Sequence, residues 1–449
     1  MSTTPTNELS ALEWRRAFAE GKLDLLDTIG AHMQYVEHAN ESIQAFVSFG
    51  GKELHDQLDQ LKAWRDSGQE LGPLHGVPVG IKDIIDTEDF PTCYGSPIHE
   101  GRYAIADATV VRRLRQAGAV IVGKTATTEF ATFHPAKTCN PHNLEHTPGG
   151  SSSGSAAAVA AGMVPVALGS QTNGSMIRPA SFCGVYGFKP SFGLLPRTGV
   201  FDQSASLDQL GVFARNLEDL ALVSQLIAGD DGSDRATQGV ASHRFFDIAM
   251  QEPPVQPRFC FVKTPWWSQV DPDAQAAYEA FLELMGDTVD LVELPAVVEK
   301  VIDWHATVNE SELALALTSE YMHHRDGLSK PMQDRLEKAN AITAKDYLIA
   351  KSRIDNVAVA FEEFFDRYDA ILTPAALGTA PKGLGSTGNP IMQTVWSFGG
   401  LPSVNLPFLQ GDNGLPLGVQ AVGSFRQDGR LLRSLRWFVQ AFDQRSQSA

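Results

Sequence analysis

The chain has 449 residues, of which 43% are hydrophobic and 20% are charged, a composition that excludes a disordered, collagen-like or disulfide-scaffold protein. Its formal net charge of -17 argues against binding to nucleic acid or to an anionic membrane, because both are polyanions that require patches of Lys and Arg. The four cysteines, Cys93, Cys139, Cys183 and Cys260, lack CxxC spacing, so we expect reduced thiols rather than disulfides or a zinc site.

The start of the chain shows no basic segment followed by an apolar run, so we expect no secretory signal and a cytoplasmic location. The longest stretch of low charge, residues 155–170, is shorter than the roughly 20 residues that a membrane-spanning helix needs. The length exceeds the roughly 250 to 300 residues at which single cores usually stop growing, so one unusually large domain or two intimate ones are expected.

The first elements are predicted to be helices and the next ones a mixed core. Residues 8–48 place apolar side chains at steps of three or four and are predicted to be helical in two pieces. From residue 76 to 180, short apolar runs alternate with amphipathic segments, which is typical of an α/β core. Within it, residues 107–118 predict a helix that ends at glycine, and residues 119–122 predict a buried strand.

The second half of the chain predicts a connection, more α/β structure and a long helical region. Residues 229–257 are polar and irregular, as in a connection between elements. Residues 301–367 carry a helical pattern, and residues 368–374 predict a strand that proline ends.

Residues 147–190 are rich in small hydroxylated residues and glycine. Glycines let several backbone NH groups approach a ligand, and serines supply nucleophiles and proton relays. A Ser/Gly-rich stretch is often only a flexible linker. Here residues 156–161 predict a helix and residues 165–169 a strand, so regular structure is expected to hold both serine clusters.

Two short segments in this part of the chain match known sequence motifs, but the secondary structure predicted around them does not fit either motif. Gly150 to Gly154 fits the G-x-S-x-G elbow of α/β-hydrolases, but residues 140–148 read as a loop and no histidine follows His324. Gly118 to Thr125 fits the P-loop spelling, but a helix precedes it and the residues within it predict a strand, which cannot curl around a phosphate.

Three motifs taken together resemble the amidase signature family. They are His75-Gly-Val-Pro-Val-Gly-Ile-Lys82-Asp83, Gly149-Gly-Ser151-Ser152 and, 24 residues after Ser151, Gly174-Ser175 leading into Arg178-Pro179. The resemblance continues through Asp208-Gln-Leu-Gly211 to Gly414-Leu-Pro-Leu-Gly-Val-Gln420, so it covers almost the whole chain.

The resemblance implies a role for each motif. Ser175 would be the nucleophile, Ser151 the residue after a cis peptide bond, and Lys82 the base that acts through Ser151. Such a chemistry is coherent, because a serine hydroxyl needs a proton acceptor at neutral pH and a lysine kept neutral by burial is one. The backbone NH groups of Thr172, Asn173, Gly174 and Ser175 would form the oxyanion hole.

For Lys82 the alternative is a salt-bridged lysine beside Asp83. The apolar residues Val77, Val79 and Ile81 around it favour burial and therefore the catalytic interpretation. For Ser152, a proton relay and a hydrogen bond to a backbone group are both left open.

The chain departs from the family pattern at three positions. The family commonly has Asp and Gly where this chain has Gln171 and Asn173, and its Arg lies two residues after the nucleophile, whereas Arg178 lies three after it. A subset of the family that shares this Gln and shifted Arg includes members that act on small carboxylated amides. Arg178 would then either bind a substrate carboxylate or brace the core against an acid such as Asp83, and the bracing role is favoured.

Other clusters predict little chemistry. His142 and His146 have the spacing of two histidines that bind one metal ion from the same face of a helix. Pro141 and the loop composition around it argue against a helix here, so no metal site is expected. Several aromatic and histidine side chains in the second half are expected to pack in the core or on the surface rather than line a pocket: Trp266, Trp267, Trp304, His305, Tyr321, His323 and His324.

We therefore expect one large α/β amidase-signature domain over residues 1–449, with a mixed sheet flanked by helices on both faces. Its core would span about 71–222, and a more variable helical region on the substrate side about 265–367. The expected activity is hydrolysis of the C–N bond of a small amide without metal or cofactor. The alternatives are a carbamate or urea-derivative hydrolase and a partner-dependent amidotransferase-type subunit; for assembly, a homodimer is one option.

Overall fold

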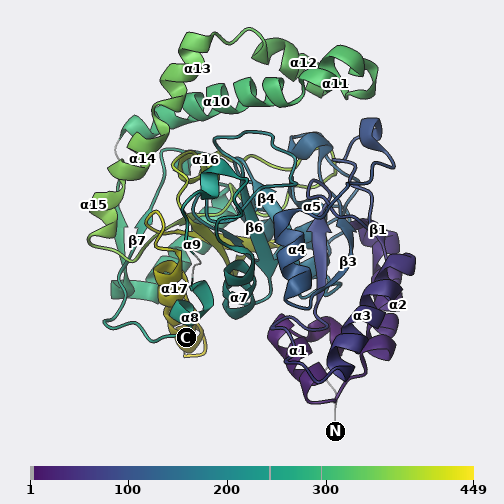
Figure 1. Cartoon of the computed structure of the whole chain (residues 1–449). Helices are drawn as coiled ribbons and strands as arrows, with labels where there is room; N and C mark the ends of the chain where they lie inside the picture. Colours follow the sequence, from purple (N-terminus) through teal and green to yellow (C-terminus); the bar gives the residue numbers. More distant parts are fainter. Residues whose placement is uncertain (1–4, 242–243, 295, 449) are drawn as a thin grey trace.

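The computed structural model describes residues 5–241, 244–294 and 296–448, and within these ranges eleven strands form one mixed sheet (Figure 1). The strand order is β1-β3-β2-β4-β6-β5-β10-β11-β9-β7-β8. The strands are β1 (Phe46–Phe49), β2 (Pro78–Lys82), β3 (Val120–Thr125), β4 (Val166–Gln171), β5 (Tyr186–Lys189), β6 (Gln209–Ala214), β7 (Phe259–Val262), β8 (Val289–Val292), β9 (Ala370–Pro374), β10 (Ser403–Gln410) and β11 (Pro416–Val422).

The sheet contains two parallel groups joined by antiparallel strands. β2 pairs in parallel with both β3 and β4, and β7 pairs in parallel with both β8 and β9. The strands between these groups, from β6 to β11, pair antiparallel. β2 is therefore a central strand with neighbours on both sides, and all five of its residues are buried.

Helices cover both faces of the sheet, as the alternation of side chains in β5 shows. A Cβ on Gly187 would lie 2.7 Å from the Cβ of Ala180 in α6, whereas the ring of the next residue, Phe188, packs on Phe245 of α8 with centroids 6.3 Å apart. Successive residues of a strand point to opposite faces, so α6 and α8 lie on opposite faces.

The α-helices described in the first two-thirds of the chain are α1 (Ala11–Ala19), α2 (Leu25–Ile43), α3 (Gly51–Asp66), α4 (Thr109–Gln116), α5 (Ser153–Ala160), α6 (Ile177–Cys183), α7 (Leu217–Ile227), α8 (Phe245–Ala249) and α9 (Pro272–Met285). The others are α10 (Val301–Ala316), α11 (Thr318–His323), α12 (Lys330–Ala339), α13 (Ala344–Lys351), α14 (Ile354–Ala360), α15 (Glu362–Phe365), α16 (Ile391–Phe398) and α17 (Asp428–Ser446).

The helical prediction for residues 8–48 is correct for α1 and α2 but wrong for its last residues. Gln44 ends α2 in the left-handed conformation, with φ 53°, and the chain then forms strand β1. β1 pairs antiparallel with β3 and is the edge of the sheet. Sequence periodicity does not resolve so short a strand after a long helix.

The helical prediction for residues 301–367 is confirmed. The helices α10 to α13 form an arm above the sheet in Figure 1. α10 packs against α12, α13 and α16, so the arm is attached to the body through α10. The predicted connection over residues 229–257 also contains the short helix α8. None of the helices in the described ranges is long and apolar enough to span a membrane.

Candidate active site

Lys82 lies at the carboxyl end of β2, where the parallel neighbours β3 and β4 enclose it. Its side chain is fully buried. The Nζ atom donates a hydrogen bond of 2.7 Å to Ser151 Oγ and one of 2.9 Å to Ser170 Oγ. Lys82 and Ser151 are thus in direct contact, and no carboxylate hydrogen-bonds to this amine among the described residues.

Burial sets the protonation of this amine. It lowers the pKa of Lys82 to about 7, and the nearby carboxylate of Asp208 acts in the opposite direction. Asp83, the alternative partner named by the sequence, instead lies with its Oδ1 3.9 Å from Nζ of Lys124. A large fraction of Lys82 is therefore neutral near pH 7 and able to accept a proton.

Ser151 follows two glycines in the loop that leads into α5. The peptide bond between Gly150 and Ser151 is cis. Gly149 has φ 83°, and a Cβ on it would lie 2.9 Å from Cα of Pro179. Only glycine fits this conformation and this close approach, so the loop depends on Gly149 to reach the position that presents Ser151 to Lys82.

Ser175 lies in the turn between β4 and α6. The Oε1 atom of Gln171 accepts the NH groups of Met176 (2.7 Å) and Ile177 (3.0 Å) and so anchors the start of α6. Among the described residues, no acceptor takes the NH groups of Asn173, Gly174 or Ser175, and the hydroxyl of Ser175 makes no hydrogen bond. The turn thus presents free donors beside a free hydroxyl, which is the arrangement that an oxyanion requires.

Contacts from three directions hold this turn in place. Thr172 Oγ1 donates a 2.5 Å hydrogen bond to Asp208 Oδ1, and Nε2 of His305 lies 3.1 Å from the carbonyl oxygen of Thr172. Burial lowers the pKa of His305 to about 4, so this ring is neutral and donates through Nε2. From α16, Thr394 and Ser397 hydrogen-bond to the side chain and the carbonyl oxygen of Asn173.

The structure places Ser152 and Arg178 away from the Lys82 amine. Ser152 Oγ donates to the carbonyl oxygen of Ser170 and accepts from its NH, at 3.1 and 3.2 Å. Arg178 is buried and donates to the carbonyl oxygens of Gly150 and Thr387, both at 2.7 Å. It contacts no carboxylate among the described residues, so the expected bracing against Asp83 is wrong.

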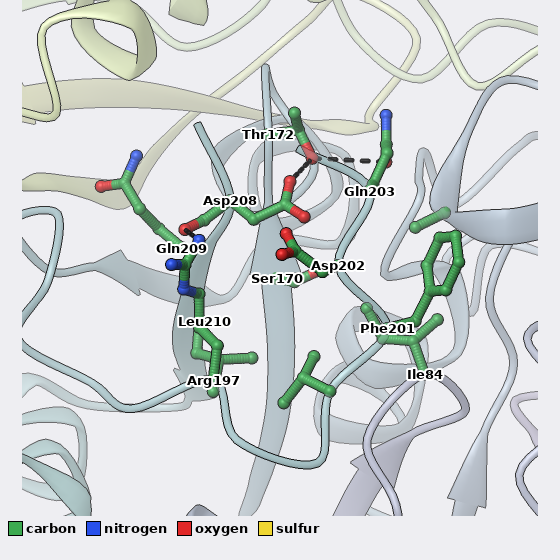
Figure 2. A pocket seen from close by; sticks show the side chains of 12 residues that line it. Ile84, Ser170, Thr172, Arg197, Phe201, Asp202, Gln203, Asp208, Gln209 and Leu210 are labelled. Carbon is green, nitrogen blue, oxygen red and sulfur yellow. Dashed lines mark hydrogen bonds between the residues drawn. The ribbon is translucent and has the colours of Figure 1, made fainter. Parts of the chain in front are cut away.

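Two adjoining pockets meet at the turn that carries Ser175. The first is lined by twelve residues: Ala131, Thr132, Phe133, Thr172, Asn173, Gly174, Ser175, Arg178, Gln203, Asn309, Arg335 and Pro390. The second, drawn in Figure 2, lies behind Thr172 and shares Ala131, Thr172 and Gln203 with the first. We name them the nucleophile pocket and the rear pocket.

Acidic side chains line the rear pocket but not the nucleophile pocket. Figure 2 shows Asp202 and Asp208 beside Ser170, with Thr172 bonded to both Asp208 and Gln203. None of the twelve residues of the nucleophile pocket is Asp or Glu. The two pockets therefore differ in charge, although they share a wall.

The other residues that the sequence offered as metal ligands or phosphate binders make structural hydrogen bonds instead. His142 and His146 each make a single ring hydrogen bond, to the carbonyl oxygens of Cys183 and Ala380, and no group of three metal-ligating side chains occurs in the described ranges. Lys124, which belongs to the segment that matches the P-loop motif, lies in strand β3. Its amine donates hydrogen bonds to the carbonyl oxygen of Ile85 and to Thr92 Oγ1.

Sequence reasoning missed Ser170, the second partner of Lys82, as well as Asp208 and Arg335 as parts of the site. Ser170 follows an apolar run and looks like the end of a buried strand. Its role depends on the parallel pairing of β2 with β4, which brings together residues 88 apart in sequence. No local signal in the sequence reports that pairing.

Comparisons with known proteins agree with this fold. The amidase family model matches residues 27–432. A glutamyl-tRNA(Gln) amidotransferase subunit of Symbiobacterium thermophilum is 33% identical, with 96% of each chain aligned. Among solved structures, the peptide amidase of Stenotrophomonas maltophilia is 28% identical with a TM-score of 0.84, covering 99% of this chain and 98% of that chain.

A second solved structure, from work on a vestigial protein complex and the evolutionary origins of an s-triazine catabolic enzyme, is 28% identical with a TM-score of 0.88, covering 95% of this chain and 97% of that chain. The fold thus defines a single-domain α/β protein of the amidase-signature type. The chain belongs to the amidase family.

Proposed function

We propose that this protein hydrolyses the C–N bond of a small amide through an acyl-enzyme on Ser175, with Lys82 and Ser151 as the proton relay. The observation that carries the proposal is the buried Lys82 amine, 2.7 Å from Ser151 Oγ, with a pKa that burial lowers to about 7. An amine in this state takes a proton from a hydroxyl near neutral pH and returns it to a leaving group.

In the first step, Ser175 Oγ forms a bond to the amide carbonyl carbon, and its proton passes through Ser151 to Lys82. The charge on the carbonyl oxygen is stabilised by the free NH groups of the turn over residues 173–175. The C–N bond then breaks as the proton returns through Ser151 to the departing nitrogen. Water attacks the ester by the same route, and the acid leaves with Ser175 restored.

The free Ser175 hydroxyl is compatible with this sequence of steps. It makes no hydrogen bond within the described residues, and it lines the nucleophile pocket. Catalytic hydrogen bonds are often completed only when substrate is present. We propose that the helical region of about 265–367 forms the substrate side, because Asn309 and Arg335 from this region line the same pocket.

A hydrolysis panel of aliphatic amides, aryl amides, urea derivatives and carbamates tests the proposal on the purified chain. We expect release of ammonia or amine from at least one class. Lys82→Ala and Ser175→Ala are each expected to lower kcat/KM by at least about 10³-fold, the scale of losing a general base or a nucleophile. Full activity of the Ser175 variant would overturn the mechanism.

A second candidate function is that of a partner-dependent amidotransferase-type subunit. It is supported by the relatives at 29% to 33% identity, each of which is named as part of a glutamyl-tRNA(Gln) amidotransferase. A purified chain that is inert on the whole panel, yet becomes active when a partner protein is added, would favour this candidate. Turnover by the chain alone would exclude the need for a partner.

A further inference from the structure

Two carbonyl groups of the turn that carries Ser175 are held by side chains from outside the turn. Nε2 of His305, in α10, lies 3.1 Å from the carbonyl oxygen of Thr172. The hydroxyl of Ser397, in α16, hydrogen-bonds to the carbonyl oxygen of Asn173. Both side chains are buried. Two successive peptide groups of the turn are therefore fixed from two separate helices.

The donor in each of these hydrogen bonds is defined by its partners. A carbonyl oxygen can only accept, so the His305 ring and the Ser397 hydroxyl both donate. The ring is neutral, because burial lowers its pKa to about 4, and its one proton is therefore on Nε2. Gln171 Nε2 donates to Ser397 Oγ at 2.9 Å, which leaves the hydroxyl proton for the carbonyl oxygen of Asn173.

The side chain of Gln171 also connects the two ends of the turn. Its Oε1 atom accepts the NH groups of Met176 and Ile177, which follow the turn. An ionised carboxylate at this position could accept the same NH groups, but it has no proton to donate to Ser397. The glutamine therefore ties the backbone on both sides of the turn to α16.

The geometry of a trans peptide relates each carbonyl contact to the direction of an NH group. The C=O of one residue and the N–H of the next lie in one plane and point in opposite directions. Within the described ranges the one cis peptide bond is between Gly150 and Ser151, so the peptides after Thr172 and Asn173 are trans. Since both carbonyl oxygens point to α10 and α16, the NH groups of Asn173 and Gly174 point away from these helices.

These two NH groups belong to residues that line the nucleophile pocket. Neither NH finds an acceptor within the described residues. A backbone NH does not rotate by itself, so its direction depends on how its peptide plane is held. Donors that already have the right direction need no reorganisation when charge develops on a carbonyl oxygen, and they are then most effective.

The helices α10 and α16 also support each other. They pack together, and the ring of His305 lies on Phe398, the neighbour of Ser397, with centroids 6.4 Å apart. Thr394 of α16 donates a further hydrogen bond of 2.9 Å to Oδ1 of Asn173. Because α10 belongs to the helical arm, the arm contacts the turn directly through His305.

We propose that His305 and Ser397 are positioning residues for the oxyanion hole. By holding the two carbonyl oxygens, they orient the NH groups of Asn173 and Gly174 toward the carbonyl oxygen of the substrate. Neither side chain needs to contact the substrate, because each acts through the backbone. The inference rests on the proposed function, since it assumes that an oxyanion forms beside the nucleophile. It assigns this role to two helices outside the three sequence motifs.

The test compares 4-nitrophenyl acetate with its thiono analogue, in which sulfur replaces the carbonyl oxygen. Both esters acylate the same serine, but sulfur is a weak acceptor, so only the oxygen ester uses the oxyanion hole fully. In His305→Phe and in Ser397→Ala, the ratio of kcat/KM for the oxygen ester to that for the thiono ester is expected to fall by about tenfold to a hundredfold. This is less than the loss of a donor outright. The fall is expected in kcat rather than in KM.

His305→Gln and Ser397→Thr keep a donor at each position and are expected to restore most of the ratio. The matched control is His32→Phe, which removes another buried histidine that donates to a backbone carbonyl, that of Met163 at 2.8 Å. His32 lies in α2, so this variant is expected to unfold earlier than the native protein but to keep its ratio. Ser397→Ala removes one oxygen atom and carries the test if His305→Phe does not fold.

An equal loss with both esters in His305→Phe and Ser397→Ala would show that the two residues are only structural and would overturn the inference. A fall of the ratio in His32→Phe as large as in those variants would overturn it too, because any loss of stability would then have the same effect.

The variant Ser175→Ala separates this inference from the proposed function. Hydrolysis of both esters is expected to require Ser175. Hydrolysis that persists unchanged in Ser175→Ala, or a native protein that hydrolyses neither ester, would overturn the proposed function and the inference with it. Hydrolysis that requires Ser175, but whose ratio does not respond to His305→Phe and Ser397→Ala, would overturn the positioning role alone and leave the acyl-enzyme intact.

Discussion

The protonation state of Lys82 results from a competition between burial and one carboxylate. Burial lowers the pKa of the lysine to about 7, and Asp208 raises it. Asp208 is itself buried, which raises its own pKa to about 6, and Thr172 and Ser204 donate to it. The same carboxylate thus holds the turn that carries Ser175 through Thr172 and raises the pKa of the Lys82 amine.

The first prediction concerns pH. Because neutral Lys82 is the proposed base, kcat/KM is expected to rise about tenfold per pH unit below about pH 7 and to level off above it. Asp208→Asn removes a charge that favours the ammonium form, so its inflection is expected at lower pH. Steady-state rates measured from about pH 5 to about pH 9 check this, because that range brackets the expected inflection.

The control for this prediction is Asp202→Asn, because Asp202 lines the same rear pocket but does not shift the pKa of Lys82. Its inflection is expected to stay in place. An Asp208→Asn profile that keeps or raises the inflection would contradict the assignment of Asp208.

The second prediction concerns the hydroxyl partners of Lys82. Ser151→Ala removes the proposed relay and is expected to lower kcat/KM by about 10² to 10⁴-fold. Ser170→Ala removes only one hydrogen bond that positions the amine, so we expect a loss of about tenfold. Ser152→Ala is expected to cost less than Ser170→Ala, since the Ser152 hydroxyl bonds to backbone groups. A Ser152 variant as impaired as the Ser151 variant would make Ser152 the relay.

Among individual residues, the sequence predicts the place of those site side chains that lie within a local motif. Lys82 ends an apolar run and Ser151 follows two glycines, so burial of the one and a tight loop for the other are predictable. Ser170 and Asp208 are brought to the site by strand pairing. Arg335 reaches the site from a helix more than 150 residues away from Ser175 in the sequence. Such contacts depend on tertiary structure that no local pattern reports.

At the scale of elements, helix α10 links the helical arm to the loop that precedes β6 and packs behind the turn that carries Ser175. Glu312 of α10 accepts hydrogen bonds from Ser204 Oγ, Ser206 NH and Ser206 Oγ at 2.5 to 2.9 Å. It also accepts one of 2.7 Å from Tyr347 in α13. The loop that Glu312 holds contains Gln203, which lines both pockets, and Asp208.

The third prediction follows from this link. Glu312→Ala leaves several buried donors unpaired and is expected to lower the free energy of unfolding by about 2 to 4 kcal/mol. It is also expected to raise KM, because the loop that carries Gln203 loses its anchor. Thermal unfolding and steady-state rates check both effects.

Asp326→Ala is the control, since this aspartate is exposed on the same arm. Its unfolding midpoint is expected to match that of the native protein. If the Glu312→Ala variant has the same unfolding midpoint as the Asp326→Ala variant, the arm is not anchored through Glu312.

At the scale of the molecule, the predicted α/β class, the mixed sheet and helices on both faces are confirmed. Alternating short apolar runs and amphipathic segments carry that information, because they reflect burial on a sheet. The strand order, with β6 inserted between β4 and β5, is not predictable in this way. It is set by which strands pair across long sequence separations, as β5 does with β10.

The fold places the ends of these strands so that β2 supplies the proposed base, and the turn after β4 supplies the proposed nucleophile and its donors. The loop before α5 adds Ser151 between them in the proposed relay. Three segments far apart in sequence therefore contribute one group each, and the central claim is that they act together on a covalent intermediate.

The most direct measurement of that claim is the intact mass and peptide map of the protein after reaction with a serine-reactive phosphonate. We expect one adduct per chain, on Ser175, that is absent in Ser175→Ala and that forms at least about 10²-fold more slowly in Lys82→Ala. An adduct on Ser152, or labelling of Ser175 at an unchanged rate without the Lys82 amine, would contradict the account.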